Sequence, residues 1–358
     1  MDANANPAGT DGFEFVEYTA QDTRALASLF EAMGFAAIAR HRSKDVVLYR
    51  QGQVNFIINH EPESYAQRFA KAHGSSICAF AIRVKDAAKT YERAINLRAK
   101  PVQGEVGPME LNIPGIRGVG RSLIYLVDRY GDRSIYDVDF VPLEGARPDP
   151  FGVEITYIDH LTHNVRKGHM DEWAHFYERI FNFREIRYFD IHGRATGLKS
   201  RAMVSPCGKI RIPINEPADP RSQIQEYLKL YHGEGIQHVA LATDDIYATV
   251  AQLRKNGIRF MDVPDSYYDM VDARIPEHGE DLERLRTHGI LIDGVSPSRL
   301  PGRRGVGTGL LLQIFTETVI GPIFFEIIQR KGNEGFGEGN FQALFEAIER
   351  DQMKRGVI

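Results

Sequence analysis

Three kinds of feature that this sequence has little of limit what the protein can be. The chain of 358 residues contains only two cysteines, Cys78 and Cys207, too few for a disulfide framework, which predicts free thiols in a reduced cytosol. Its formal net charge is −4, so no basic surface for nucleic acid is expected. No apolar run approaches the roughly 18–20 residues that a membrane-spanning helix needs. These absences predict a soluble, cytoplasmic protein without nucleic-acid or membrane partners.

The opening residues, MDANANPAGT, also lack the basic segment followed by an apolar one that marks a signal peptide. We expect residues 1–11 to form a short disordered tail. Apolar residues make up 43% of the chain and charged residues 26%, which is typical of a globular protein. The length favours two domains.

A weak internal repeat divides the chain into two halves. DTRALASLFEAMGF and MDEWAHFYERIFNF each predict a helix with apolar side chains at the same offsets, and Gly34 ends the first. SICAFAIRVKDAAKTYERAINL and GIQHVALATDDIYATVAQLRKNG each predict a strand, an Asp cap and a helix, with Asp86 and Asp245 in matching places. Segments rich in β-branched and aromatic residues predict further strands around residues 46–58, 122–140, 200–215 and 310–329.

The Pro- and Gly-rich stretch at 145–153 is the expected boundary, which gives a first domain over residues 12–150 and a second over 151–358. The Gly-, Pro- and Arg-rich segment at 296–309 is interpreted as a surface insertion. A glycine-rich turn precedes a predicted terminal helix at about 340–355. This turn lacks the Lys-Ser/Thr pair of a phosphate-binding loop, so we expect a mobile loop that leads into the helix.

Glu326 lies in a strongly apolar predicted strand, GPIFFEIIQRKG. Alternation places Phe324 and Ile328 on the same face as Glu326 and three apolar residues on the other, so both faces are expected to be buried. Burying an unpaired carboxylate is costly, so Glu326 needs a cation or hydrogen-bond partners. A salt bridge to an arginine is the simpler alternative.

Two histidines also lie in predicted strands: His238 in GIQHVALAT and His160 in YIDHLTHNV. A lone histidine in a strand is usually a satisfied core residue. His163 follows His160 at an odd offset, so the two face opposite sides and cannot share a metal ion. Aligning the two Asp caps puts Ala79 at the position of His238, and the opening strand of the first half, FEFVEY, has no histidine. Because the histidines cluster in one copy of the repeat, we infer a site in the second half.

His160, His238 and Glu326 have the chemistry of the facial triad that binds non-haem iron(II). Three ligands on one octahedral face leave three positions open for substrate and dioxygen. The long separations along the chain match no short motif. The residue pattern alone therefore leaves both a metal site and ordinary buried side chains open.

At these residues the sequence resembles a known family. DHLTHNV, GIQHVAL, RIPINEP, LLQIFTET, GPIFFEIIQRKG and GFGEGNFQALFEAIERDQ resemble, in the same order, segments of the 4-hydroxyphenylpyruvate dioxygenases. The resemblance covers almost the whole chain and is strongest after residue 155. It implies an α+β fold of two vicinal-oxygen-chelate (glyoxalase/bleomycin-resistance-like) domains, each built from two βαβββ modules that form an open barrel. It also implies that His160, His238 and Glu326 hold iron(II), and that the first domain has no metal.

The resemblance further implies a substrate pocket, lined by Ser200, Pro213, Asn215, Gln223, Gln237, Gln313, Phe315, Phe324, Phe336 and Phe341. The amides of Asn215, Gln223 and Gln313 are the expected catalytic groups, which would hydrogen-bond the phenol or reaction intermediates. Gln313 could instead satisfy neighbouring backbone, and Phe315 and Phe324 could be plain core. A direct substrate contact is least expected of Gln237, which is out of phase with the ligand beside it.

The implied activity converts 4-hydroxyphenylpyruvate and dioxygen to homogentisate and carbon dioxide, a step of tyrosine and phenylalanine catabolism. Oxidative decarboxylation of the chelated 2-oxo acid would give an iron(IV)-oxo oxidant that attacks the ring. Phe336 and Phe341 flank the glycine-rich turn, and the terminal helix would act as a lid over the pocket. Homo-oligomers are common in the family, so a homo-oligomer is also implied.

Three alternatives stay open. 4-Hydroxymandelate synthase uses the same substrate but hydroxylates the benzylic carbon, and Asn215 and the phenylalanines favour ring attack over it by resemblance. An extradiol ring-cleaving dioxygenase shares the fold class, but the PINEP and FGEGNF segments argue against it. A metal-free binding protein is the third, and the three intact potential ligands argue against that.

Overall fold

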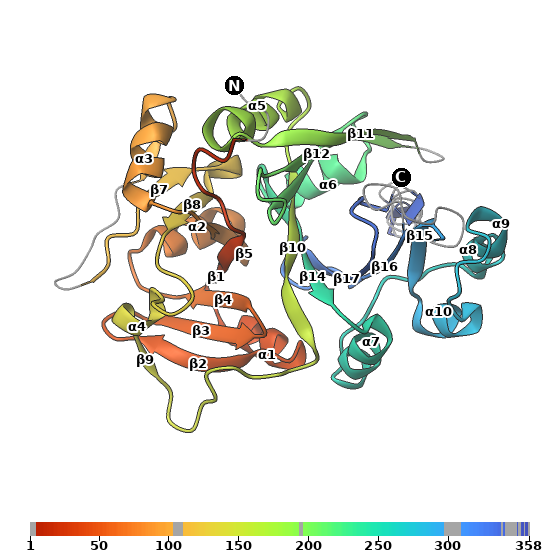
Figure 1. The fold of residues 1–358 in the computed structure, drawn as a ribbon, viewed down its shortest axis with the longest axis horizontal. Helices are drawn as coiled ribbons and strands as arrows, with labels where there is room; N and C mark the ends of the chain where they lie inside the picture. Colours follow the sequence, from red (N-terminus) through yellow and green to blue (C-terminus); the bar gives the residue numbers. More distant parts are fainter. Residues whose placement is uncertain are drawn as a thin grey trace.

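The structure is a computed structural model that describes residues 5–102, 110–192, 196–296 and 309–337, and a few single residues beyond: 339, 340, 349, 352, 353, 355 and 356. Figure 1 shows the first half of the chain in red to yellow on the left and the second half in green to blue, mostly on the right. No helix within these ranges is long and apolar enough to cross a membrane.

The first half contains two βαβββ modules joined by a helix. The first module is β1 (Phe13–Thr19), α1 (Arg24–Ala32), β2 (Ala36–His41), β3 (Val46–Gln51) and β4 (Val54–Asn59), and α2 (Tyr65–His73) follows it. The second is β5 (Ser76–Arg83), α3 (Ala87–Asn96), β6 (Pro101–Val102), β7 (Gly115–Arg117) and β8 (Leu123–Val127), with the 3-10 helix η1 (Val119–Arg121) before β8. Helix α4 (Tyr136–Asp139) and strand β9 (Phe140–Pro142) follow the second module. The described strands of this half form one sheet in the order β6-β7-β8-β5-β1-β4-β3-β2-β9.

The second half repeats this plan. Its first module is β10 (Ile155–Asn164), α5 (Met170–Phe181), β11 (Arg184–His192), β12 (Gly197–Val204) and β13 (Arg211–Pro217), followed by α6 (Gln223–Leu230). The second is β14 (Gly235–Thr243), α7 (Ile246–Lys255), β15 (Leu291–Val295), β16 (Gly309–Phe315) and β17 (Phe324–Lys331). Three short helices, α8 (Asp265–Tyr268), α9 (Val271–Arg274) and α10 (Leu282–His288), lie between α7 and β15. The sheet order is β11-β12-β13-β10-β14-β17-β16-β15, so the predicted repeat of paired modules is confirmed.

Helix starts follow the expected side-chain caps. Asp86 accepts a hydrogen bond from the backbone N–H of Lys89 at the start of α3, and Asp245 accepts two such bonds at the start of α7. Asn182 ends α5 in the left-handed conformation, with φ 58°. These local signals fix where α3 and α7 begin and where α5 ends.

Two expectations about the first half are wrong. Residues 5–11, expected to be disordered, are ordered: Asn6 bonds to Thr10 through its side chain, and Ala8 and Thr10 are buried. The strand expected around 122–140 stops at Val127, because a turn with a positive φ at Gly131 leads into α4. The segment at 297–308, within the expected insertion, lies outside the described residues.

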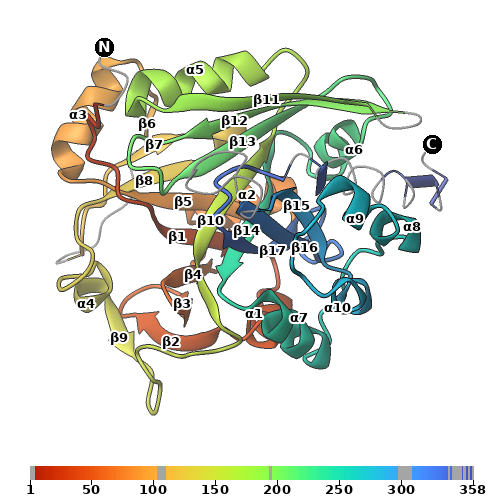
Figure 2. The same ribbon diagram turned by 45° about the vertical axis from the view of Figure 1, so that its right-hand side comes forward.

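A continuous hydrophobic core joins the two sheets. The rings of Phe56 on β4 and Phe325 on β17 stack with centroids 5.9 Å apart, and Tyr177 and His163 contribute from the second half. The chain passes from one sheet to the other between Pro142 and Ile155, and β10 crosses the middle of the molecule beside β14 (Figure 2). Since Phe325 faces this shared core, its neighbour Glu326 points to the opposite face of β17.

Candidate metal centre

Three adjacent central strands of the second sheet bring the predicted ligands together. His160 lies on β10, His238 on β14 and Glu326 on β17, and all three are buried. His160 Nε2 is 3.1 Å from Glu326 Oε2 and 3.3 Å from His238 Nε2, while His238 Nε2 is 3.4 Å from Glu326 Oε2. Two imidazole nitrogens and one carboxylate oxygen therefore form a small triangle.

This triangle fits a first-row divalent metal ion. For ligand bonds of about 2.1 Å, neighbouring ligand atoms in an octahedral site lie about 3.0 Å apart. The observed separations of 3.1–3.4 Å need only small adjustments to reach this geometry. Two neutral imidazoles and one carboxylate are the donor set of non-haem iron(II) sites with open positions.

A β-bulge precedes each of the two histidines. Ile158 pairs with Leu241 and His160 with Ala240, so Asp159 is the extra residue on β10. On β14, Gln237 is the extra residue, because Thr162 pairs with His238 and His163 with Ile236. A bulge turns a side chain out of the normal alternation, and in both places it brings the residue before the histidine to that histidine's Nδ1.

The bulged residues orient the two imidazoles. His160 Nδ1 lies 2.9 Å from Asp159 Oδ1, and His238 Nδ1 lies 3.2 Å from Gln237 Oε1. Both partner atoms are acceptors, so each Nδ1 carries a hydrogen, and each Nε2 is the nitrogen left to bind a metal ion at the centre of the triangle. The expectation that His163 faces away is confirmed, since its Nε2 is 2.8 Å from the hydroxyl of Tyr177.

Asp159 is itself held by arginines. Arg330 Nε and Nη2 donate to its two oxygens at 2.7 and 2.8 Å, and Arg211 lies 3.6 Å away. Burial alone would raise the pKa of Asp159, but Arg330, the bond from His160 and Arg211 hold it well below its usual value. Asp159 therefore stays ionised in a dry environment and keeps the imidazole of His160 in place.

The electrostatic field of the site favours positive charge at the triangle. Burial alone would lower the pKa of His160, but Glu326 and Asp159 outweigh it and raise this pKa to about 9. Burial alone would raise the pKa of Glu326, but the two histidines lower it to about 2. A cation is thus stabilised at the point where the three ligand atoms meet.

Aromatic rings surround the triangle. Phe324 stacks on His238 with ring centroids 4.8 Å apart, and Phe336 makes a T-shaped contact with His160, with centroids 5.6 Å apart. Phe315 packs against Phe324 at 6.1 Å. Gln313 Nε2 donates to Glu326 Oε1 at 2.6 Å. With Gln237, which contacts His238, five predicted pocket residues therefore contact the ligands or one another.

The other predicted pocket residues lie elsewhere on the same sheet or beside it. Ser200 on β12 pairs with Asn215 on β13, whose Nδ2 donates to Asn164 at 3.3 Å. Within the described residues, the Ser200 hydroxyl and Asn215 Oδ1 are buried without a hydrogen-bond partner, as expected of groups that await a polar ligand. Pro213 and Gln223 are buried, and Phe341 lies outside the described residues.

Sequence reasoning missed three residues that support the ligands: Asp159, Arg211 and Arg330. Asp159 was missed because of the bulge: strict alternation along the strand would point its side chain away from that of His160. Arg330 carried a usable signal, because it lies four residues after Glu326 on the same strand face. A buried arginine in phase with a buried carboxylate predicts an acidic partner nearby.

The first sheet has equivalent positions without the ligands. His160 pairs with Ala240, which pairs with Glu326; in the same way Phe15 pairs with Ala81, which pairs with Tyr125. Phe15, Ala79 and Tyr125 thus occupy the places of His160, His238 and Glu326, in agreement with the alignment of the Asp caps.

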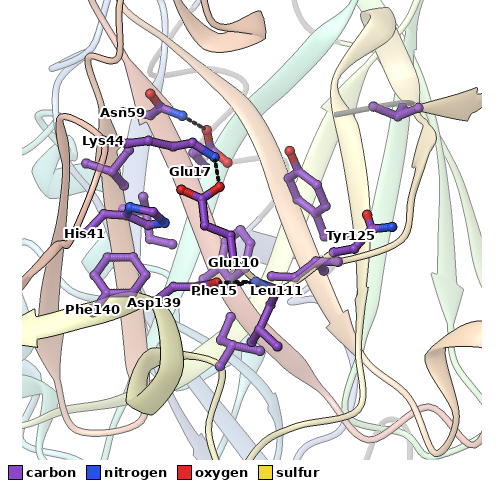
Figure 3. Close-up of a pocket in the computed structure, with 16 residues that line it drawn as sticks. Phe15, Glu17, His41, Lys44, Asn59, Glu110, Leu111, Tyr125, Asp139 and Phe140 are labelled. Carbon is purple, nitrogen blue, oxygen red and sulfur yellow. Dashed lines mark hydrogen bonds and ion pairs between the residues drawn. The ribbon is translucent and has the colours of Figure 1, made fainter. Parts of the chain in front are cut away.

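A cavity of about 180 Å³ opens beside these positions, and Figure 3 shows its lining. Its polar groups bond to one another: Asn59 Nδ2 donates to Glu17 at 2.7 Å and Lys44 Nζ to Glu110 at 2.7 Å. Burial raises the pKa of Glu17, and hydrogen bonds from Asn59 and Cys78 counter this only in part. The first sheet has internally paired polar groups where the second sheet has converging ligands.

Comparisons with known proteins agree with this picture. Residues 4–141 match the model of the hydroxyphenylpyruvate dioxygenase (HPPD) N-terminal family, and residues 157–270 match the Glyoxalase/Bleomycin resistance protein/Dioxygenase superfamily. The chain is 60% identical to a 4-hydroxyphenylpyruvate dioxygenase of Pseudomonas aeruginosa, with 99% of this chain and 97% of that protein covered. It is also 60% identical to the protein named hemolysin VllY of Vibrio vulnificus, covering 99% and 98%. A solved mutant of 4-hydroxymandelate synthase from Streptomyces coelicolor has TM-score 0.82 at 25% identity, covering 97% of this chain and 100% of that one.

Proposed function

The chain belongs to the 4-hydroxyphenylpyruvate dioxygenase family, and on this premise we propose that it converts 4-hydroxyphenylpyruvate and dioxygen to homogentisate and carbon dioxide. The observation that carries the proposal is the buried triangle of His160, His238 and Glu326, with ligand atoms 3.1–3.4 Å apart. A first domain over residues 12–150 and a catalytic second domain over 151–358 belong to the same proposal, supported by the change of sheet between Pro142 and Ile155.

We assign iron(II) to the three ligands, since this donor set with open positions suits a ferrous ion. When bound, iron(II) would supply chelation of the 2-oxo acid and the activation of dioxygen. Asp159 and Gln237 hold the two imidazoles with Nε2 turned inward. Phe315, Phe324 and Phe336 keep water from the reacting atoms.

The polar residues of the pocket have a separate task. The buried and unpaired Ser200 hydroxyl and Asn215 Oδ1 offer hydrogen bonds to a polar substrate group, with Gln223 near the same strands. Gln313 carries two amide hydrogens and uses one on Glu326, so the other is available to substrate. A site that bonds the phenol hydroxyl should discriminate against phenylpyruvate, because losing that hydroxyl leaves buried groups unpaired.

4-Hydroxymandelate synthase is the second candidate, because a mutant of it shares the fold over nearly the whole chain. The identity of 25% to that structure, against 60% to the Pseudomonas aeruginosa dioxygenase, favours homogentisate as product. Both candidates use the same substrate and the same triad, so metal binding alone does not separate them.

The test is oxygen uptake with product identification. Metal-free protein is loaded anaerobically with iron(II), and oxygen is admitted with 4-hydroxyphenylpyruvate or with phenylpyruvate. We expect iron-dependent uptake and homogentisate as the aromatic product. 4-Hydroxymandelate as product would replace the proposal by its alternative, and equal uptake without iron would overturn the metal assignment.

A cytoplasmic location and a homo-oligomeric state complete the proposal. Free Cys78 and Cys207, and the lack of a membrane-spanning helix among the described residues, support the cytoplasmic location. The homo-oligomeric state rests on the family resemblance. Light scattering after size exclusion should give a mass that is a multiple of 40.4 kDa, and a mass of one chain would contradict it.

A further inference from the structure

We propose that Asn340 is a positioning residue for the metal centre: through a hydrogen-bond relay with a single direction, it fixes the amide of Gln313 and thereby the carboxylate of Glu326. The relay runs from Tyr267 through Asn340 and Gln313 to Glu326. The inference rests on the proposed metal site and adds to it a link from the start of the C-terminal segment to one of the three ligands.

The direction of the relay is set at Tyr267, between α7 and β15. The backbone N–H of Ile292 and Nη2 of Arg274 both donate to the Tyr267 oxygen at 2.8 Å. The hydroxyl has one hydrogen of its own to donate. These two donors fill the lone pairs of the Tyr267 oxygen, so the hydroxyl can only donate, to the carbonyl of Ile292 at 2.9 Å and to Asn340 Oδ1 at 2.8 Å. Asn340 must therefore face Tyr267 with its oxygen.

Each amide then fixes the next one. With its oxygen facing Tyr267, Asn340 presents Nδ2, which donates to Gln313 Oε1 at 2.9 Å. With Oε1 occupied in this way, Gln313 presents Nε2 to Glu326 Oε1 at 2.6 Å. A reversed Gln313 amide would place two acceptor oxygens against each other, so the network has one consistent orientation.

The last bond decides which carboxylate oxygen serves the metal. Glu326 Oε1 accepts from Gln313, while Oε2 lies 3.1 Å and 3.4 Å from the two imidazole nitrogens. The relay thus separates the two oxygens into one that is held by the protein and one that faces the histidines. We expect Glu326 to bind through Oε2 alone, which leaves more positions open than a two-oxygen contact.

Burial makes the relay hard to replace with water. Asn340 is 0% exposed, Gln313 3% and Glu326 2%, and Tyr267 is 9% exposed. A buried amide that loses its partner keeps the full cost of its desolvation. The backbone N–H of Gly339 also donates to Asp293 at 2.8 Å, so the residue before Asn340 is held in place as well.

Asn340→Leu tests the relay, because leucine keeps the size of the side chain and removes both hydrogen bonds. The matched control is Asn333→Leu in the same segment. Asn333 is also buried, with 4% exposure, and its side chain makes two hydrogen bonds outside the relay. The probe is Co²⁺ titrated into metal-free protein, with the visible ligand-field spectrum as the second readout. Both variants are repeated in a Gln313→Met background.

We expect Asn340→Leu to weaken Co²⁺ binding roughly tenfold and to change the spectrum, while Asn333→Leu changes affinity less than about twofold at a similar loss of thermal stability. In the Gln313→Met background, Asn340→Leu should have little further effect, because its route to Glu326 is already cut. Equal losses in both backgrounds, or an unchanged spectrum in Asn340→Leu, would overturn the relay.

Tyr267→Phe is the second variant if Asn340→Leu does not fold, since it removes the hydroxyl that sets the direction. It should shift the spectrum the same way by a smaller amount, and no shift would count against the relay. Failure of the proposed function is distinguishable: a wild-type chain that binds Co²⁺ but makes no homogentisate with iron(II) refutes the reaction and leaves the relay standing.

Discussion

The two halves of the molecule share strand order, crossover helices and even irregularities, yet among the described residues only the second half gathers metal ligands. In the first sheet Phe15 and Tyr125 lie where the second has His160 and Glu326, and their rings pack 5.9 Å apart. The fold supplies three inward positions on adjacent strands in either case. What those positions do is decided by the side chains placed there.

The irregularities are as instructive as the differences. Register shifts occur at Glu14 and Cys78 in the first sheet, each one residue before the equivalent of a histidine ligand. These are the places of Asp159 and Gln237 in the second sheet. The bulges therefore belong to the scaffold, and the second half uses them to bring an acceptor to each imidazole.

The largest expected effect on metal binding and turnover comes from comparing the equivalent inward positions on β8 and β17, Tyr125 and Glu326. Glu326→Gln removes a ligand, so it should abolish metal retention and lower turnover by more than the roughly 100-fold that loss of a supporting residue can cause. Tyr125→Phe, at the matching place, should leave both within about twofold. Metal content after dialysis and oxygen uptake measure the two, and a loss of metal in Tyr125→Phe would break the comparison.

A smaller effect is expected from the acids at the two equivalent bulges, Glu14 on β1 and Asp159 on β10. Asp159→Asn should weaken metal binding by roughly 10–100-fold and cost about 3–5 kcal/mol of stability, because Arg330 and Arg211 lose a buried partner. Glu14→Gln breaks a 2.5 Å pair with the more exposed Arg83 and should cost about 1–2 kcal/mol. Urea unfolding and metal titration check both values.

Metal affinity should be unchanged in Glu14→Gln. If the two substitutions weakened metal binding alike, the bulge acid would act through general stability, and the role of Asp159 in orienting His160 would be refuted.

The smallest effect concerns the cavity of the first half. Burial raises the pKa of Glu17, so the folded state holds this proton more tightly than the unfolded chain. The ionised form therefore lowers stability increasingly as pH rises above the ordinary glutamate range. Glu17→Gln should raise the melting temperature by roughly 1–2 °C at pH 8 and by less at pH 5, with turnover unchanged. A larger gain at pH 5 would contradict the sign of this shift.

The sequence predicted the modules well, because strand and helix periodicities and Asp caps are local signals. The resemblance to a family named the three residues that the structure brings together. Alternation could not place Asp159 and Gln237, since each sits in a bulge that depends on pairing with another strand. Tyr267 and Asn340 were out of reach for another reason: their contact joins segments 73 residues apart, and nothing in either segment indicates its partner.

Local composition was also misleading at the amino-terminal end. The polar string over residues 5–11 resembles a flexible tail, but Lys85 donates to the carbonyl of Ala8 and Lys209 contacts Asp11. Such bonds require strands that are distant in sequence to be already in place.

The stacking of Phe325 on Phe56 has a consequence for how this protein can be divided. Strand β17 belongs to both halves: one face carries the ligand Glu326, and the other face packs against the first half of the chain. Cutting the chain at residues 145–153 would expose the apolar face of β17 to water and leave two aggregation-prone fragments in place of two stable domains. A gene that encodes the second half by itself should yield aggregates, even though every metal ligand is included.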